Sequence, residues 1–298
     1  MAARLATLLN GKKVAAEILE ELVKVKRARA PGLATILVGA RPDSAKYVAA
    51  KHAACKKVGI DTSKSAVLAD VGELERKIDE LNNDDSVDGI LLQLPLPDNK
   101  DQEKYISKIA HSKDVDGFHP YNVGMLCRSG EAKRQGSNPY FCAPCTPAGI
   151  MTLLERYKVP LEGKRAVVIG RSNVVGLPMM LMLTHANATV TCVHSRSHDI
   201  VETCRQADVV IAAIGKANIV KGSWIKPGAV VVDVGINFAN GKLTGDVDFD
   251  EVKHVASLIT PVPGGVGPMT VATLIQNTVR NAEMRDLSRA MPLQQMTA

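Results

Sequence analysis

Residues 167–176 read Val-Val-Ile-Gly-Arg-Ser-Asn-Val-Val-Gly, and this stretch decides the fold of the 298-residue chain. The apolar run predicts a buried strand ending at Ile169, Gly170 permits a tight turn, and a helix should begin close to Val175. The stretch departs from the Gly-x-Gly-x-x-Gly pattern of dinucleotide-binding turns, because Ser172 holds the middle-glycine position and the last glycine is displaced. It is therefore compatible with an ordinary strand–helix turn as well as with a nucleotide site.

The next predicted strand favours the nucleotide site. A site for NAD carries an Asp or Glu at the end of this strand, where it binds the ribose 2′-hydroxyl. Here residues 189–193 run into His194, Ser195 and Arg196, with no acid. A hydroxyl and a guanidinium bind a 2′-phosphate through charge-assisted hydrogen bonds, and Arg171 in the first turn can reach the same place. The sequence therefore predicts NADP as the cofactor.

Strands and helices alternate on both sides of this stretch, which predicts an α/β fold with parallel sheets covered by helices. The second half resembles half of a Rossmann fold. Its strands are expected at residues 165–169, 189–193, 208–213 and 229–234, and its helices at 147–157, 175–186 and 199–205. In the first half we expect helices at about 14–22, 44–58 and 73–82, and strands at 34–38, 65–68 and 89–94.

Two domains are expected from the length of the chain. Residues 127–142 are polar, basic and rich in Gly, Ser and Asn, so they predict a surface loop near a domain boundary. A last helix, with Thr270 as its N-cap, should lead the chain back to the first domain. We expect an N-terminal α/β substrate domain (residues 1–148 with 281–298), a Rossmann-like NADP-binding domain (149–280) and a cleft between them.

Composition excludes several classes of protein. The net charge is +6, and the cations are spread along the chain without a basic run interleaved with aromatic residues, which argues against binding to nucleic acid. No stretch approaches the roughly 18 apolar residues of a membrane helix. Among six cysteines, Cys142 and Cys145 have the spacing of a redox pair, but no second pair completes a zinc site. We expect reduced thiols, no metal and a cytoplasmic protein.

Three polar features predict a reacting site in the first domain. Tyr47 and Lys51 are four residues apart on a predicted helix, so they share a face, with Ser44 one turn earlier. Gln93 stands at a strand end, where α/β sheets place their ligands. Asp114 and Asp116 offer paired acids in a turn, although turn chemistry alone would account for them. On an exposed helix the Tyr47–Lys51 pair would be an ordinary surface contact, so these features alone leave both readings open.

The loop over residues 260–270 adds a fourth feature. It reads Thr-Pro-Val-Pro-Gly-Gly-Val-Gly-Pro-Met-Thr and leads into a helical pattern. Glycines allow backbone to approach a ligand closely, and a rigid loop feeding a helix N-terminus can lay main-chain amides against a flat or anionic molecule. A tight turn between domains is the alternative. Together with the turn at Gly170 and the Tyr47–Lys51 pair, the loop indicates an enzyme.

In combination these segments closely resemble the bifunctional methylenetetrahydrofolate dehydrogenase/cyclohydrolases. The resemblance keeps the family's order and extends from about residue 9 to 281. Its matching segments are Tyr47-Val-Ala-Ala-Lys51, Gln93-Leu-Pro-Leu-Pro97, Lys113-Asp-Val-Asp-Gly117, Pro144-Cys-Thr-Pro147, Gly170-Arg-Ser172, Asp233-Val-Gly-Ile-Asn237 and residues 261–270. It implies oxidation of 5,10-methylenetetrahydrofolate to 5,10-methenyltetrahydrofolate by NADP⁺ and hydrolysis to 10-formyltetrahydrofolate, in a stand-alone bifunctional homodimer joined through the Rossmann domain.

The resemblance also implies roles for individual residues. Lys51 would be the central residue of the hydrolytic step, Gln93 would hold it, Tyr47 would stack on or bind the folate, and Asp116 would bind the pterin nitrogens. Substrate contacts are implied for Ser44, Leu92, Leu94, Pro263, Gly264, Gly265, Val266 and Gly267. Cofactor contacts are implied for Thr146, Gly170, Arg171, Ser172, Ser195, Arg196 and Ile236.

Two rival functions remain. One is a monofunctional methylenetetrahydrofolate dehydrogenase, against which the presence of both Lys51 and Gln93 argues, because hydride transfer alone needs no such pair. The other is an NADP-binding sensor without catalysis, which the presence of Lys51, Gln93 and Asp116 disfavours.

Overall fold

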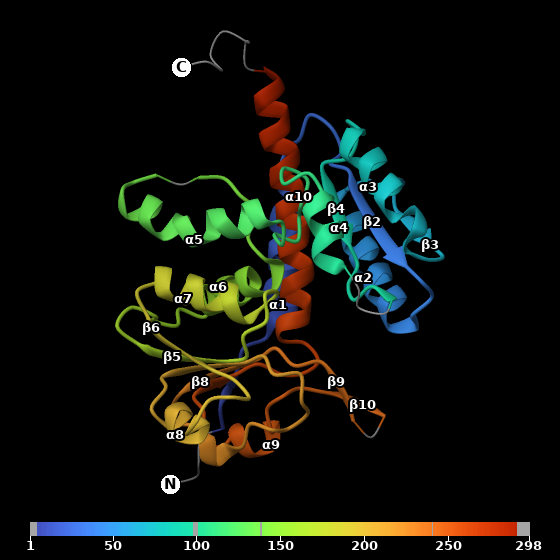
Figure 1. Ribbon diagram of the computed structural model, residues 1–298. Coiled ribbons are helices and arrows are strands. Elements are labelled where there is room, and N and C mark those ends of the chain that lie inside the picture. Colours follow the sequence, from blue (N-terminus) through green and yellow to red (C-terminus); the bar gives the residue numbers. More distant parts are fainter. Residues whose placement is uncertain (1–4, 98–100, 138, 240, 291–298) are drawn as a thin grey trace. The chain divides into compact units, whose positions relative to one another are not determined.

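The computed structural model describes residues 5–97, 101–137, 139–239 and 241–290 (Figure 1). The described residues divide into two compact units. One, the six-stranded unit, takes its residues from 1–16, 126–139 and 144–270; the other, the three-stranded unit, from 17–125, 140–143 and 271–298. The boundary between the units runs through helices α1 (Gly11–Lys24), α5 (Pro120–Arg134) and α10 (Val266–Ala290). The domain boundaries expected from the sequence stay a prediction.

The six-stranded unit contains an all-parallel sheet in the order β1-β11-β8-β7-β5-β6. The strands are β1 (Thr7–Leu8), β5 (Arg165–Ile169), β6 (Thr189–Val193), β7 (Val209–Ala212), β8 (Val230–Asp233) and β11 (Leu258–Ile259). Helices α6 (Cys145–Arg156), α7 (Gly176–His185), α8 (Ile200–Arg205) and α9 (Phe249–Val252) accompany them, with the hairpin β9 (Asn237–Ala239) and β10 (Lys242–Thr244). Strand β5 begins the alternation and pairs with both β6 and β7, so the chain reverses its direction of travel across the sheet here.

The core of this unit follows from the apolar runs of its central strands. Every residue of β7 and β8, including the terminal Asp233, is buried. Val167 and Ile169 of β5, Val210 and Ala212 of β7, and Val231 of β8 pack into one cluster on a single face of the sheet. Helices cover both faces of such a sheet, which is why β-branched residues occupy consecutive positions instead of alternating with polar ones. The parallel sheet predicted for this half is confirmed.

The three-stranded unit is also built on a parallel sheet, with β2 between its neighbours in the order β3-β2-β4. The strands are β2 (Leu33–Val38), β3 (Ala66–Leu68) and β4 (Gly89–Leu92), and the helices are α2 (Pro42–Val58), α3 (Leu74–Asn83) and α4 (Gln102–Lys108). Leu74, Ile78 and Leu81 give α3 a buried stripe that packs on Ile36 and Ile90 of the sheet. Because β2 is central, its carboxyl end and that of β4 lie at the same edge, and α2 and Gln93 follow them.

Two sequence expectations are wrong. The loop expected from residue 127 is helical to Arg134, as the last part of α5. Gly130 contributes to packing there, because a Cβ at this position would lie 2.2 Å from a ring carbon of His185 on α7. Helix α10 begins at Val266, so Thr270 lies inside it and its hydroxyl donates to the Val266 carbonyl (3.4 Å) instead of capping the N-terminus. Pro268 is tolerated in the first turn, where its missing N–H has no helical partner to lose.

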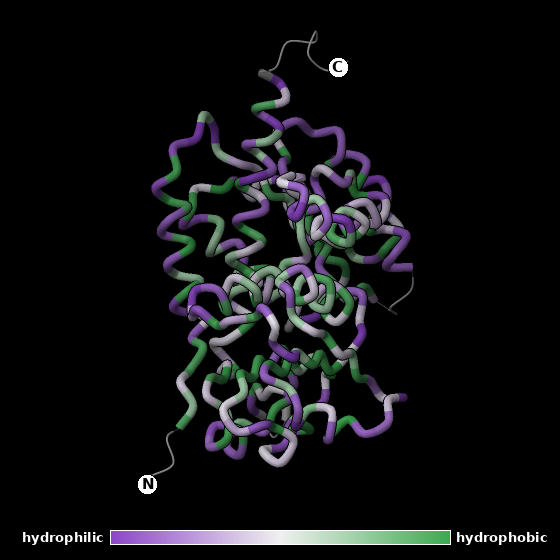
Figure 2. The backbone as a smooth tube through the Cα atoms, turned by 90° about the vertical axis from the view of Figure 1, so that its left-hand side faces the viewer, coloured by the Kyte–Doolittle hydropathy of each residue, from purple (hydrophilic) through white to green (hydrophobic). Residues whose placement is uncertain are grey.

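Hydrophilic and hydrophobic residues are interspersed along the backbone (Figure 2). Within the described residues, no helix has the length and apolar character needed to cross a membrane.

Candidate active site

Lys51 and Gln93 form the central contact of the three-stranded unit's polar edge. Lys51 extends from the middle of α2, and Gln93 is the first residue after β4. The Lys51 Nζ donates a hydrogen bond to Gln93 Oε1 at 2.9 Å. Gln93 Nε2 donates to the Leu94 carbonyl at 2.7 Å, which settles the orientation of the amide because a carbonyl can only accept. The amide oxygen therefore faces the lysine.

Other residues expected near Lys51 lie on the same two elements. On α2, Tyr47 lies one turn before Lys51 and is 40% exposed, and Ser44 lies two turns before Lys51 and is buried. Leu92 is buried as the last residue of β4, and Leu94 is partly buried beyond Gln93. The structure thus brings Lys51 and Gln93 together and leaves a tyrosine ring accessible on the same helix. The substrate contacts of these residues stay a prediction.

The turn that carries Asp116 is organised by Asp114. Asp114 is 2% exposed, and its carboxylate accepts from Gly117 N (3.0 Å), His119 N (2.8 Å) and Asn122 Nδ2 (2.9 Å). Gly117 adopts a φ of 74°, which favours glycine. The turn chemistry that the paired acids suggested therefore belongs to Asp114, and Asp116 is the half-buried acid that this turn holds in place.

Asn277 is a positioning residue that the sequence reasoning missed. From the interior of α10 its Nδ2 donates to the carbonyls of Val115 (2.9 Å) and Ala143 (3.2 Å). The first carbonyl belongs to the residue before Asp116. Asparagine is unfavourable inside a helix unless its side chain has a partner, so an asparagine within the predicted helix was the available signal.

In the six-stranded unit, the turn after β5 requires its glycines. Gly170 has a φ of 124°, and a Cβ there would lie 2.2 Å from the Ala213 carbonyl oxygen after β7. A Cβ on Gly176 would lie 2.4 Å from the Gly170 oxygen. Ser172 replaces the expected middle glycine, and its Oγ accepts from Val175 N (3.1 Å) and Gly176 N (3.4 Å). The serine thus stabilises the entry to α7, while the backbone passes close to the sheet.

The residues predicted to choose the cofactor lie at adjacent strand ends. Ile169 and Val193 are paired in register, and Gly170 N donates to the Val193 carbonyl at 2.8 Å. Arg171 follows the first strand, and Ser195 and Arg196 follow the second, all with exposed side chains. The structure therefore places a hydroxyl and two guanidinium groups on neighbouring segments at the carboxyl edge. Charge-assisted hydrogen bonds to a phosphate are the chemistry that this set supports.

The glycine-rich loop before α10 is held against α1 within the same unit. Lys12 N donates to the Gly264 carbonyl at 2.9 Å, and Gly264 has a φ of 107°. A Cβ on Gly11 would lie 1.9 Å from the Gly265 oxygen, so α1 and the loop approach as closely as backbones can. Pro263 lies in this loop, whereas Val266 and Gly267 form the first turn of α10. At the start of α6, Thr146 Oγ1 lies 3.0 Å from Thr270 Oγ1.

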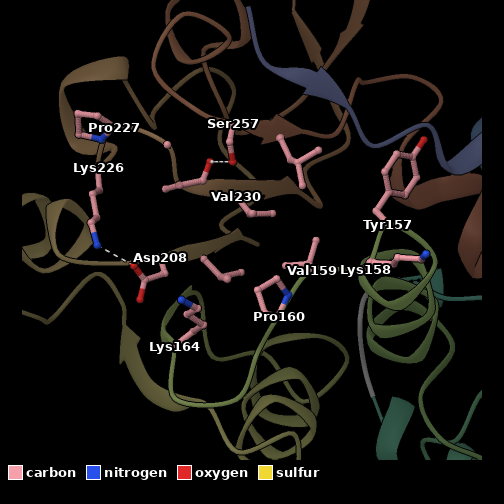
Figure 3. A pocket seen from close by; sticks show the side chains of 14 residues that line it. Tyr157, Lys158, Val159, Pro160, Lys164, Asp208, Lys226, Pro227, Val230 and Ser257 are labelled. Carbon is pink, nitrogen blue, oxygen red and sulfur yellow. Dashed lines mark hydrogen bonds and ion pairs between the residues drawn. The ribbon is translucent and has the colours of Figure 1, made fainter.

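A separate cavity of about 380 Å³ lies at the opposite edge of the six-stranded sheet (Figure 3). Its lining includes Lys164, Asp208 and Ser257, which directly precede β5, β7 and β11, so it opens at the amino ends of these strands. Lys226 forms an ion pair with Asp208 there at 2.7 Å. Open α/β sheets bind their ligands outside the carboxyl ends, so this cavity is not the cofactor site.

Cys142 and Cys145 are buried free thiols. Cys142 Sγ donates to Asn281 Oδ1 at 3.2 Å, and burial raises the pKa of Cys142 to about 12. A thiol kept neutral in this way is a poor nucleophile and metal ligand. Within the described part of the chain, no group of three or more His, Cys, Asp or Glu side chains could hold a metal ion.

The fold and these two polar edges define a two-domain α/β enzyme with a nucleotide-binding sheet. Family models agree with this class. One described as "Tetrahydrofolate dehydrogenase/cyclohydrolase, catalytic domain" matches residues 9–116, and one described as "Tetrahydrofolate dehydrogenase/cyclohydrolase, NAD(P)-binding domain" matches residues 144–286. The chain belongs to the tetrahydrofolate dehydrogenase/cyclohydrolase family.

Individual relatives match almost the whole chain. The "Bifunctional protein FolD" of Magnetococcus marinus is 50% identical over 94% of this chain and 98% of its own length. The crystal structure of the bifunctional FolD enzyme from Campylobacter jejuni is 47% identical, with a TM-score of 0.87, and covers 94% of this chain and 99% of its own. That of the Trypanosoma brucei enzyme, complexed with NADP cofactor and inhibitor, is 38% identical with a TM-score of 0.87, over 95% and 99%. The family expected from the sequence, and with it a bifunctional enzyme, is confirmed.

Proposed function

We propose that this enzyme oxidises 5,10-methylenetetrahydrofolate with NADP⁺ and hydrolyses the resulting 5,10-methenyltetrahydrofolate to 10-formyltetrahydrofolate. The observation that carries the proposal is the Lys51–Gln93 hydrogen bond at the end of β4. A lysine held in one place by an amide is suited to a hydrolytic step, whereas hydride transfer alone needs no such pair. The match to both family domains and the similarity to bifunctional relatives support both half-reactions.

The six-stranded unit fits NADP. Gly170 lets the turn after β5 pass against the Ala213 carbonyl, and the segment after β6 offers Ser195 and Arg196 where an NAD site has a carboxylate. When bound, the nicotinamide accepts the hydride that leaves the methylene carbon. The protein's contribution is to bind and orient both reactants, which converts an encounter between two molecules into a reaction within one complex. Arg171 and Arg196 would hold the 2′-phosphate, and Thr146 and Ile236 would lie along the cofactor.

The hydrolytic step requires proton transfers in addition to binding and orientation. Water adds to the cationic methenyl carbon and loses a proton, the bond to one ring nitrogen breaks, and that nitrogen is protonated as the formyl group forms. These transfers need a group that exchanges protons close to the reacting carbon. Lys51 would act either as that group or as a charged donor that steers the water. Gln93 holds the amine and thereby limits the number of positions that the long side chain samples.

Two further residues would bind the pterin. The Asp116 carboxylate suits the paired N–H donors of the ring, because two carboxylate oxygens accept from two neighbouring donors. Asp114 and Asn277 hold the turn on which Asp116 lies. Tyr47, with 40% of its surface exposed on α2, presents a ring on which a flat heterocycle could stack.

A continuous spectrophotometric assay at the methenyl absorbance tests the function, with methylenetetrahydrofolate as substrate and NADP⁺ or NAD⁺ as cofactor. The bifunctional enzyme produces a transient methenyl signal that decays as formyltetrahydrofolate forms. A methenyl signal that accumulates and decays no faster than by uncatalysed hydrolysis would identify the alternative, a monofunctional dehydrogenase. Absence of a signal with either cofactor, despite NADP binding, would identify a sensor.

The compartment and assembly belong to the same proposal. Six free cysteines in the described residues suit the reducing cytoplasm, where disulfides are rare. The family resemblance supports a homodimer through the six-stranded unit. Light scattering of the purified protein should give about twice the mass of one chain, and the mass of a single chain would reject the dimer.

A further inference from the structure

Asp246 is a buried acid of the six-stranded unit to which the proposed function assigns no role. It is fully buried, and its carboxylate accepts four hydrogen bonds. Oδ2 accepts from Ile214 N (2.6 Å) and Gly215 N (2.9 Å), and Oδ1 accepts from Lys216 N and Asn237 Nδ2 (both 2.9 Å). All four donors are neutral amides. A buried carboxylate is costly unless its oxygens are satisfied, and here hydrogen bonds satisfy both.

The three backbone donors are consecutive residues of the loop that follows β7. Successive N–H groups that converge on one point form a concave anion site of the kind that binds phosphates in nucleotide-binding proteins. Here the protein's own carboxylate occupies that site. The amides of residues 214–216 are therefore not available to a ligand, and the loop is held in one conformation before any cofactor arrives.

The fourth donor links this loop to the next strand end. Asn237 and Ile236 follow β8, and Ile236 is 50% exposed. A Cβ on Gly235 would lie 2.3 Å from Asp246 Oδ1, so only glycine lets this segment pass so close to the carboxylate. Asp246 thus holds the segments after β7 and β8 at once.

Asp233 in turn holds Asp246. Its Oδ1 accepts from Gly235 N and Asp246 N, both at 2.9 Å, and its Oδ2 accepts from Val247 N at 3.0 Å. A Cβ on Gly245 would lie 1.8 Å from Asp233 Oδ2. Two carboxylates and two obligatory glycines therefore form one compact cluster beneath the carboxyl edge of the sheet.

This cluster lies near the strand ends where the nicotinamide half of a bound cofactor is expected. A dinucleotide whose pyrophosphate lies at the turn after β5 extends across the carboxyl ends of the strands on either side of the switch point. The 2′-phosphate side is at β6, so the nicotinamide side is at β7 and β8. Resting on the proposed function, we propose that Asp246 is a positioning residue for the nicotinamide half of the cofactor, acting through residues 214–216 and 235–237, with Asp233 holding Asp246 in place.

Asp246→Asn is the direct test, because it preserves shape and removes charge. Each Asp246 oxygen accepts two donors, so the new NH₂ group must face two N–H groups whichever way the amide turns. We expect the KM for NADP⁺ in the oxidation of methylenetetrahydrofolate to rise at least about tenfold, a loss on the scale of one charged hydrogen bond. Hydrolysis of supplied methenyltetrahydrofolate without cofactor should stay within about twofold of the unmodified enzyme.

Asp208→Asn is the matched control. It makes the same substitution in the same unit but at the amino edge, and should leave both activities unchanged. A normal KM for NADP⁺ in Asp246→Asn would overturn the inference, as would equal loss of both activities, which marks a purely structural residue. If Asp246→Asn does not fold, the same two activities are measured in Asn237→Ala, which removes one donor and keeps the carboxylate. A raised KM for NADP⁺ with normal hydrolysis would then support the inference, and a normal KM would overturn it. An unmodified enzyme without dehydrogenase activity would instead reject the proposed function.

Discussion

Lys51 of α2 donates a hydrogen bond of 2.9 Å to the side-chain oxygen of Gln93, which directly follows β4. The glutamine is itself anchored, because its amide nitrogen donates to the Leu94 carbonyl. A helix and a strand end are thus joined by one polar contact that holds the amine of a flexible side chain. The roles proposed for the two half-reactions depend on this contact.

Gln93→Leu removes the acceptor for Lys51 while keeping a side chain of similar size. We expect hydrolysis of methenyltetrahydrofolate to fall about 10- to 100-fold, because the amine is no longer held where proton transfer occurs. Dehydrogenase activity should fall far less. Stopped-flow absorbance measures both steps, and Gln135→Leu, an exposed glutamine of the chain, is the control. Unchanged hydrolysis in Gln93→Leu would show that the contact is incidental.

Cofactor choice should follow from the segment after β6. NADP⁺ should be preferred to NAD⁺ by at least about tenfold in kcat/KM, roughly 1.4 kcal/mol, because Ser195 and Arg196 stand where an acid would mark NAD. Ser195→Asp should reduce or reverse this preference by repelling the 2′-phosphate. Ser223→Asp, which adds the same charge elsewhere on the unit, should not. Equal use of NAD⁺ by the unmodified enzyme would reject the assignment.

Cys142 and Cys145 should take no part in the reaction. Both are buried, and burial raises the pKa of Cys142 to about 12, so the Cys142 thiol is not activated as a nucleophile or metal ligand. Activity should therefore be the same with and without a thiol reductant or a zinc chelator. Loss of activity on adding either reagent would mean that a disulfide or a metal is required.

The stability of the enzyme should report the titration of Asp233. Burial raises the pKa of this carboxyl from 3.8 to about 6, against the opposing effect of its three backbone hydrogen bonds. Both the folded and the unfolded protein are protonated there below pH 3.8, so Asp233 carries no penalty in acid. Between pH 3.8 and 6 this carboxyl ionises in the unfolded chain before it ionises in the folded protein, so the free energy of unfolding decreases. Above pH 6 the total loss of stability is roughly 3 kcal/mol.

Urea unfolding of the native protein and of Asp233→Asn between pH 4 and 7 measures this effect. The difference in free energy of unfolding, native minus variant, should decrease with pH across that window. A difference that stays constant or increases with pH would contradict the raised pKa of Asp233.

The parts of the fold that could be predicted most directly are strands whose consecutive residues are apolar. Strand β5 has the bounds expected from its apolar run, since a strand buried on both faces shows no polar alternation. Strand β6 also has the expected bounds, although it lies at the edge of the sheet and alternate residues in it are exposed. The end of α5 was missed because Gly130 and its polar neighbours resemble a loop, whereas the glycine is needed for contact with His185. That contact joins residues far apart in the sequence.

Some residues of the candidate site could be expected from the sequence, and others could not. The contact between Lys51 and Gln93 was expected only from the family resemblance, because a helix position and a strand end do not by themselves show that two side chains meet. Asp246 could not be found, because its donors come from the loop after β7 and from the first residue of β9, and only folding brings them together. Turn chemistry alone did not separate Asp114 from Asp116 in the sequence, and only the resemblance singled out Asp116. The structure adds that Asp114 accepts the hydrogen bonds from Gly117 N and His119 N that organise the turn. The binding roles of the individual site residues stay predictions.

Lys51→Met tests the central claim most directly. Methionine keeps most of the side-chain length but removes the amine, so hydride transfer, which depends on binding and orientation, should remain measurable. Hydrolysis should lose the general acid–base contribution of about 10²–10⁴-fold, and methenyltetrahydrofolate should accumulate in the coupled reaction. If Lys51→Met hydrolyses methenyltetrahydrofolate at the normal rate, Lys51 is a structural residue and the account fails.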